Sequence, residues 1–200
     1  MFKILCVTNR RLCREDFFCR LEKILREKPG GLILREKDLC EEAYMALAGQ
    51  VLALCEAYRV PCILHGCPGA AGKLNHKAIH LPMPVLRGLS REDKSFFEVL
   101  GASCHSVEEA REAEALGCTY LTAGHIFATD CKMGLPGRGV GFLREVCRTV
   151  SLPVYAIGGI EAGRIPAVRE AGAAGACLMS SLMVTEDFGI LKENEAEYGR

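Results

Sequence analysis

Eight short apolar runs, rich in β-branched residues, recur along this chain of 200 residues, and polar or helix-like segments separate most of them. This alternation is typical of strands and helices that build a parallel sheet covered on both faces. Eight such units predict an α/β fold, a closed (β/α)8 TIM barrel. The predicted strands cover residues 3–8, 31–35, 61–65, 77–81, 98–103, 119–123, 153–157 and 174–179.

The segments between the runs have helical periodicity. In 107–116, for example, the apolar residues recur at the three-residue spacing of one helical face. The chain is short for a barrel, so its loops must be short, and residues 67–76 leave room for abbreviated third and fourth units. A doubly wound open sheet is the alternative, but no G-x-G-x-x-G follows the first strand. The predicted helical segments are 16–27, 40–58, 107–116, 141–150 and 164–171.

The composition limits the classes of function. Half of the residues are hydrophobic, which suits one domain over 1–200 with a frayed polar tail at 192–200. The 25 basic and 25 acidic residues cancel without a long basic run, which argues against nucleic acid or a membrane surface as a partner. The first apolar run is too short for a signal peptide or a membrane span, so we expect a cytoplasmic protein. The oligomeric state stays open, with a homodimer as one option.

The twelve cysteines do not have the spacing of a metal site or of a disulfide framework. The sequence contains no Cys-x-x-Cys pair, and Cys6, Cys62 and Cys177 lie inside apolar runs. A reduced cysteine in such a run behaves as a small hydrophobic residue. We therefore expect core thiols and no metal bound by cysteine.

Two glycines and two serines end the last two predicted strands. Gly158 and Gly159 follow the seventh strand, and Ser180 and Ser181 follow the eighth and begin a helical segment. Free backbone N–H groups at such positions suit an oxyanion, and barrels often bind phosphate between these two loops. The sequence predicts a phosphate site here, although a tight turn and a helix cap would give the same pattern.

Two cations follow the second strand. Arg35 and Lys37 alternate along an extended segment, so both are expected to point into the barrel mouth with Glu36 outward. Two fixed cations suit a carboxylate or a second anionic group. The alternative is a solvated run of charges before a helix.

The glycine-rich loop at 123–141 follows the sixth strand and contains His125, Lys132 and Arg138. An imidazole titrates near neutrality and can accept and return a proton, so His125 is the predicted catalytic residue. The alternative is a histidine that caps the strand end. Lys132 is the residue of this loop expected to contact a substrate anion.

Further polar side chains lie at other strand ends. Ser103 and His105 follow the fifth strand and are predicted substrate contacts, and His65 ends the third strand. For the two histidines, direct ligand contact and a packing role remain open.

Five motifs resemble the thiamine phosphate synthase/thiazole tautomerase superfamily, whose members are (β/α)8 barrels. The resemblance covers nearly the whole chain and implies a small phosphorylated thiazole as substrate. The motifs are LREKDL at 34–39, GASCHSVEEA at 101–110, AGHIFATDCKMGLPGRGV at 123–140, LPVYAIGGI at 152–160 and AGAAGACLMSSL at 171–182.

The synthases of this superfamily join a thiazole phosphate to a pyrimidine pyrophosphate with the help of magnesium, and this chain departs from their pattern. His65 and Gly66 replace an Asn-Asp pair after the third strand, and residues 82–85 (PMPV) replace a Gly-Gln-Glu/Asp-Asp run after the fourth. Ile33 replaces a glutamine, and His125 replaces a proline in the sixth-strand loop. Together these changes remove the carboxylates expected of a magnesium site.

The histidine loop resembles the tautomerase branch, which implies an isomerase that needs no metal or cofactor. His125 would then move a proton on a dihydrothiazole phosphate carboxylate to give the aromatic thiazole. Gly158, Gly159, Ser180 and Ser181 would hold its phosphate. Two alternatives remain: a thiamine phosphate synthase with substitute magnesium ligands, and a non-catalytic barrel that binds a phosphorylated ligand for regulation.

Overall fold

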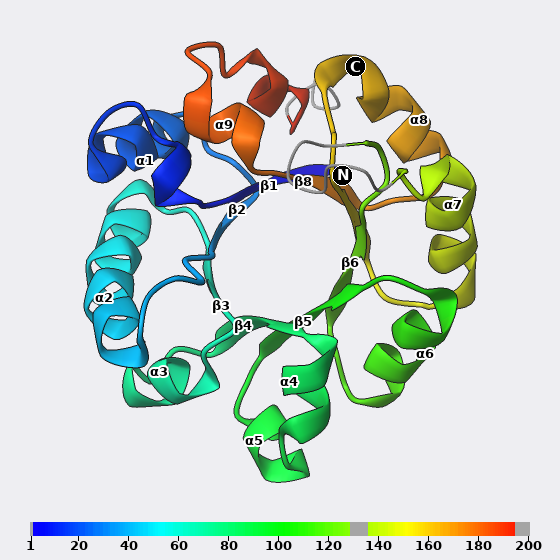
Figure 1. Ribbon diagram of the computed structural model, residues 1–200, viewed down its shortest axis with the longest axis horizontal. Coiled ribbons are helices and arrows are strands. Elements are labelled where there is room, and N and C mark those ends of the chain that lie inside the picture. The colour runs from blue at the N-terminus through cyan, green and yellow to red at the C-terminus, as the bar shows by residue number, and fades with distance from the viewer. Residues whose placement is uncertain (1, 129–135, 195–200) are drawn as a thin grey trace.

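The computed structural model describes residues 2–128 and 136–194 as a closed barrel of eight parallel strands in the order β1 to β8, with β8 beside β1 (Figure 1). This confirms the predicted TIM barrel, and each predicted strand has a counterpart. The strands are β1 (Lys3–Val7), β2 (Gly31–Leu34), β3 (Cys62–His65), β4 (Ala78–Pro82), β5 (Val99–Cys104), β6 (Tyr120–Gly124), β7 (Val154–Ile157) and β8 (Gly175–Leu178).

The helices form a ring outside the strands (Figure 1). The third and fourth units are abbreviated, as predicted, because their helices span only five or six residues each. The α-helices are α1 (Phe17–Arg26), α2 (Glu41–Tyr58), α3 (Pro68–Lys73), α4 (Met83–Gly88), α5 (Arg91–Ser95), α6 (Val107–Ala115), α7 (Gly139–Thr149), α8 (Ile165–Glu170) and α9 (Ser180–Val184). Short 3-10 helices are η1 (Arg10–Leu12), η3 (Ala162–Arg164) and η4 (Gly189–Asn194).

The last described element overlaps the start of the predicted frayed tail at 192–200. The 3-10 helix η4 continues to Asn194. Leu191 in this helix is buried in the core, which anchors the turn. Residues 195–200 of the predicted tail lie outside the described residues.

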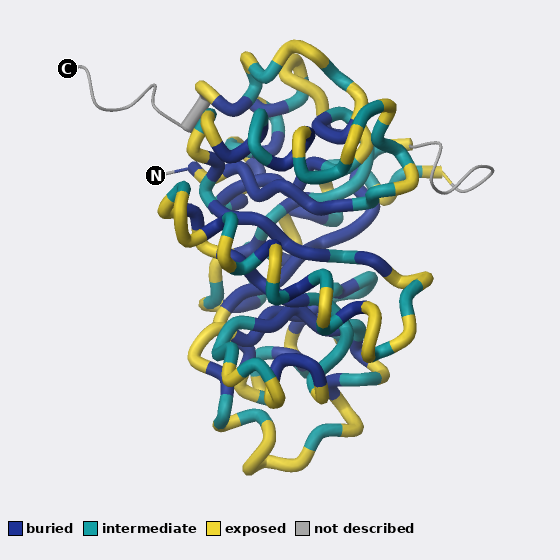
Figure 2. The backbone as a smooth tube through the Cα atoms, turned by 90° about the vertical axis from the view of Figure 1, so that its left-hand side faces the viewer, coloured by how far each residue is buried: buried dark blue, intermediate teal, exposed yellow. Residues whose placement is uncertain are grey.

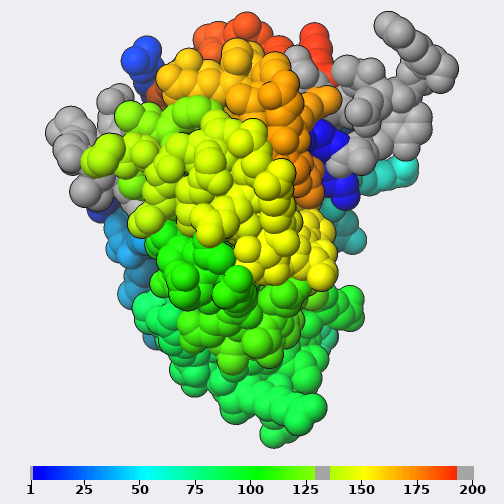
Figure 3. All heavy atoms as spheres, turned by 90° about the vertical axis from the view of Figure 1, so that its right-hand side faces the viewer, coloured from blue at the N-terminus to red at the C-terminus, as the bar shows by residue number. Residues whose placement is uncertain are grey.

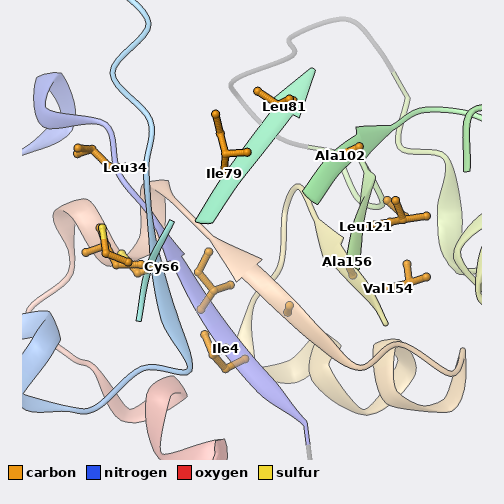
Figure 4. Close-up of a cluster of buried hydrophobic side chains, with 14 of the residues drawn as sticks. Ile4, Cys6, Leu34, Ile79, Leu81, Ala102, Leu121, Val154 and Ala156 are labelled. Carbon is orange, nitrogen blue, oxygen red and sulfur yellow. The ribbon is translucent and has the colours of Figure 1, made fainter. Parts of the chain in front are cut away.

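Two apolar layers hold the barrel together, because successive side chains of a strand point to opposite faces. The outer layer lies between strands and helices and contains Ile4, Cys6, Leu34, Ile79 and Leu81, which Figure 4 shows in their places on β1, β2 and β4. The inner layer fills the barrel with the alternate residues. Figure 2 shows the buried strands through the middle of the molecule and exposed turns outside them. The inner cluster is Leu5, Val7, Ile33, Ile63, Tyr120 and Cys177.

The helices close the outside of the barrel. Figure 3 shows the face over α6, α7 and α8, where the side chains form a continuous cover. The eleven cysteines of the described residues are free, and six of them are buried, in keeping with their predicted role in the core. Among the described residues, no helix has the length and apolar character needed to cross a membrane.

Candidate functional site

The loop after β2 is fixed by a buried carboxylate. The Thr8 hydroxyl donates to Glu36 Oε1 at 2.7 Å and accepts the Arg35 N–H at 2.9 Å. Arg10 donates to Glu36 from its backbone N–H and its guanidinium, at 3.0 to 3.2 Å. Glu36 is only 4% exposed, so the expectation that it points outward is wrong. Its position fixes the backbone between the two predicted cations.

The charges of Arg35 and Lys37 act on His65 at the end of β3. Burial and the charges of the two cations together lower the pKa of His65 to about 4. The Arg35 guanidinium also reaches past the end of β1 to the sulfur of Met179, 3.9 Å away at the end of β8. The structure therefore brings both predicted cations to the mouth, next to a neutral imidazole.

A cavity of about 340 Å³ opens beside these residues, between the loops after β2, β3 and β4. Its wall includes Tyr44, whose hydroxyl donates to the Leu34 carbonyl at 2.7 Å and accepts the His65 N–H at 2.8 Å. This tyrosine joins the ends of β2 and β3. The lining residues are Glu36, Lys37, Leu39, Glu41, Tyr44, His65, Gly66, Cys67 and Pro82.

Ser103 lies at the end of β5 in a hydrogen-bonded group inside the barrel. Its hydroxyl oxygen is 2.8 Å from Nε2 of His80 and 3.3 Å from the Thr122 hydroxyl. On its other side, the His80 ring contacts the Tyr120 hydroxyl at 2.9 Å. His80 and Tyr120 were not among the predicted site residues. Side chains alternate between the two faces of a strand, so His80 on β4 and Tyr120 on β6 both point toward the barrel axis. This alternation was the signal in the sequence that could have identified them.

His105 and His125 both lie at the β5–β6 side of the mouth. His105 Nδ1 is 3.1 Å from the Gly124 carbonyl, and its backbone N–H donates to Glu109 at 2.7 Å. His105 therefore fixes the loop geometry through these contacts.

His125 is buried, 7% exposed. Its Nε2 is 3.0 Å from the Pro136 carbonyl, which can only accept, so Nε2 carries the hydrogen. Nδ1 is buried and has no hydrogen-bond partner within the described part of the chain. Gly158 lies directly against this residue, since a Cβ on that glycine would come within 2.6 Å of the His125 Cβ. Lys132 lies outside the described residues.

The loops after β7 and β8 present backbone at the mouth. Gly158 and Gly159 have φ angles of 101° and 62°, which favour glycine. A Cβ on Gly159 would come within 2.4 Å of the Ala128 carbonyl, so the glycine pair also admits the β6 loop. Ser180 and Ser181 form the first residues of α9, as predicted.

The residues at the ends of β3 and β4 do not fit a magnesium ion, which prefers several oxygen ligands in octahedral geometry. His65, Gly66 and Pro82 stand there, and the two nearby carboxylates have other partners. Glu36 is held by Thr8 and Arg10, and Glu41 pairs with Lys73 at 2.7 Å. The described residues contain no group of three or more His, Cys, Asp or Glu side chains placed to hold a metal.

Comparison with known proteins gives a consistent assignment. The family profile described as thiamine monophosphate synthase (TMP-TENI) matches residues 4–182. "Thiamine-phosphate synthase 2" from Streptococcus pneumoniae serotype 4 is 33% identical over 191 residues, covering 92% of this chain and 89% of that protein. "Thiamine-phosphate synthase" from Desulfitobacterium hafniense is 33% identical over 193 residues, covering 93% and 91%. The solved structure of thiamine phosphate pyrophosphorylase from Pyrococcus furiosus superposes with a TM-score of 0.81 at 26% identity and covers 96% of each chain.

These similarities overturn the expectation that the chain is a thiazole tautomerase, an isomerase acting through His125. The relatives that match most of the chain carry the name of the synthase, which is a transferase. A few side chains at strand ends change more readily than the scaffold, so the histidine loop was a weak guide to the branch.

Proposed function

Because the chain belongs to the thiamine monophosphate synthase family, we propose that it catalyses the synthase reaction of that family. A thiazole phosphate would be joined to a pyrimidine pyrophosphate. The bond from the pyrimidine's carbon to the pyrophosphate oxygen breaks, a bond from that carbon to the thiazole forms, and pyrophosphate leaves.

The observation that supports this proposal is that two separate sets of residues suited to anions lie at one mouth. A reaction between two phosphorylated substrates needs two such regions, held apart by the reacting groups. Arg35 and Lys37 at the end of β2 supply charged side chains for one of them. Their fixed positive charge suits the pyrophosphate, which carries the larger negative charge.

The second region would receive the thiazole phosphate. Gly158 and Gly159 expose backbone at the end of β7, and Ser180 and Ser181 offer hydroxyls at the end of β8. The side chain of Arg35 extends as far as Met179, the residue before Ser180. This reach lets one cation lie between the two anions, where it would offset their mutual repulsion.

The metal that helps the synthases has no fitting set of ligands among the described residues at the ends of β3 and β4. No step is therefore assigned to a metal here. The charge on the departing pyrophosphate would instead be balanced by side chains of this chain, with Arg35 and Lys37 as the nearest cations to His65.

The test is a turnover assay with purified protein, thiazole phosphate and pyrimidine pyrophosphate, with separate detection of thiamine phosphate and pyrophosphate. We expect equal amounts of the two products. Arg35→Gln should lower kcat/KM, while Arg91→Gln, a change of an exposed cation on the outer helix α5, should not. A wild-type protein that binds both substrates and forms neither product would contradict the proposal.

One observation favours a second candidate, a barrel that binds a phosphorylated ligand without turning it over. The ends of β3 and β4 lack carboxylates, while the cations and the glycine loops are still present. A protein that only binds its ligand would need the cations and the glycine loops, but it would not need the carboxylates. The same assay separates the two candidates, because only the synthase releases pyrophosphate.

A further inference from the structure

Three residues from neighbouring strands form a row inside the barrel. The strand register places His80 of β4 beside Gly101 of β5, and Gly101 beside Tyr120 of β6. A Cβ on Gly101 would lie 2.2 Å from Tyr120 Cζ and 2.6 Å from His80 Nδ1. Because Gly101 has no side chain, Tyr120 and His80 can contact each other across β5.

The contact between Tyr120 and His80 determines which ring nitrogen carries the hydrogen. Tyr120 is buried, 6% exposed, and among the described residues the hydrogen-bond partner of its hydroxyl is His80 Nδ1, 2.9 Å away. A buried hydroxyl donates where an acceptor is present, so Nδ1 is the acceptor and Nε2 carries the hydrogen.

This assignment determines the direction of the Ser103 hydroxyl. His80 Nε2–H donates to Ser103 Oγ at 2.8 Å and also lies 3.4 Å from the Thr122 hydroxyl oxygen, the longer of its two contacts. The Thr122 hydroxyl donates to Ser103 Oγ at 3.3 Å. Both lone pairs of Ser103 Oγ are then occupied. Its own hydrogen is left for an acceptor outside this group, since no hydrogen bond within the described part of the chain uses it.

The group keeps this arrangement over the pH range in which enzymes work. Burial, together with the neighbouring His65, lowers the pKa of His80 to about 3. Burial also raises the pKa of Tyr120 well above its usual range. The imidazole therefore stays neutral and the phenol keeps its hydrogen, so the direction of each hydrogen bond is fixed.

The surroundings of Ser103 indicate the kind of acceptor. The His65 ring stacks on the His80 ring with 5.7 Å between centroids, and the charges of Arg35 and Lys37 act on His65. A hydroxyl that must donate, joined through the two stacked histidine rings to the region of the two cations, suits a phosphoryl oxygen. We propose that Tyr120 and His80 are positioning residues that direct the Ser103 hydroxyl to donate to a phosphoryl oxygen of a bound substrate. This inference rests on the proposed function for the identity of that substrate.

The first test measures the tautomer. In protein labelled with 15N-histidine, NMR should show the His80 hydrogen on Nε2, with the signals assigned by their loss in His80→Gln. Tyr120→Phe should raise the share of the other tautomer, because Nδ1 loses its donor. The matched control is Tyr155→Phe: Tyr155 packs against the Tyr120 ring at 5.7 Å, and its hydroxyl has no hydrogen bond among the described residues. A wild-type His80 with its hydrogen on Nδ1 would overturn the inference.

The second test measures affinity by calorimetry, with inorganic pyrophosphate in one arm and thiazole phosphate in the other. Ser103→Ala should weaken binding in at least one arm by roughly 10-fold, the size expected for a hydrogen bond to a charged group. Tyr120→Phe should weaken the same arm by about 3-fold or more, and Tyr155→Phe should leave it unchanged. The arm that responds identifies which substrate Ser103 contacts.

The outcomes separate the inference from the proposed function. Binding unchanged in both arms for Ser103→Ala, or no binding by the wild-type protein, overturns the inference. A Tyr120→Phe protein that loses only thermal stability also overturns it, because the tyrosine is then a packing residue. If the tautomer and affinity results hold but no thiamine phosphate forms, the proposed function is wrong and the inference stands.

Discussion

The two sides of the barrel mouth offer different kinds of contact. On the side of β2 to β5, the polar groups at the strand ends are side chains, among them Arg35, Lys37 and Ser103. Figure 1 shows this side of the barrel to the left of and below the side formed by β6 to β8. On the side of β6 to β8, Gly158 and Gly159 present the main chain. Side chains can be exchanged one at a time, whereas backbone groups depend on the path of the chain. We therefore expect substitutions on the first side to change affinity, and those on the second to change stability as well.

The largest effect is expected when both cations are removed from the β2–β5 side of the mouth, which we call the side-chain side. Arg35→Gln combined with Lys37→Gln should weaken pyrophosphate binding by roughly 100-fold or more, because two charge-assisted contacts are lost. Calorimetric titration measures the change, and thermal unfolding should show a stability close to the wild-type value. Arg91→Gln is the control. Equal weakening by that control would mean that only the total charge matters.

The next effect tests the backbone side. Gly159→Ala should lower the free energy of unfolding by about 2–3 kcal/mol, since alanine disfavours a φ of 62° and its Cβ would meet the Ala128 carbonyl at 2.4 Å. Gly163→Ala is the matched control, because a Cβ there has no neighbouring atom within 4 Å. Chemical denaturation measures both variants. If the two glycines tolerate alanine equally well, the β6 loop does not depend on this close approach.

The sequence predicts which residues lie at the two sides of the mouth, but it does not predict the polar groups that support them. The glycine pair at 158–159 and the serines at 180–181 could be placed at the mouth from their position after apolar runs, because such runs end at the same edge of a parallel barrel. Arg35 and Lys37 were placed there by the same reasoning.

The polar groups that support these residues could not be found this way. His80 lies within an apolar run, and its partner Tyr120 is 40 residues away in the chain. The buried position of Glu36 depends on Thr8, 28 residues earlier. Contacts of this kind follow from strand register, which the order of residue types does not specify. The branch of the family was also inferred wrongly, because the inference rested on the His125 loop and on a few replaced residues at the strand ends, among them the missing carboxylates.

A smaller effect is the dependence of the free energy of unfolding on pH. The pKa of His80 is lowered from 6.5 to about 3 in the folded protein, so the unfolded chain binds a proton that the folded one does not between these values. Stability should therefore be complete above pH 6.5 and fall as the pH decreases below it. This histidine contributes about 2 kcal/mol to the loss between pH 6.5 and 5. His80→Gln should reduce the slope, measured by urea denaturation at each pH, while Ser103→Ala should keep it. An unchanged slope in His80→Gln would mean that other groups cause the whole dependence.

The smallest effect concerns the support of the side-chain side. Thr8→Val keeps the shape of the side chain but removes the hydroxyl that donates to Glu36 and accepts the Arg35 N–H. We expect a loss of about 1 kcal/mol in stability, because Arg10 still donates to Glu36 and the half-buried Arg35 N–H can reach water. Since the backbone of Arg35 is then less restrained, pyrophosphate affinity should also fall by roughly 3-fold. Thr149→Val is the matched control, because Thr149 is a half-buried threonine on α7 whose hydroxyl donates to the Glu145 carbonyl of its own helix. A loss of stability without any change in affinity would show that the buried Glu36 stabilises the fold but does not position Arg35. Side chains on the β2–β5 side would then act independently of the backbone that carries them, as the first prediction assumes.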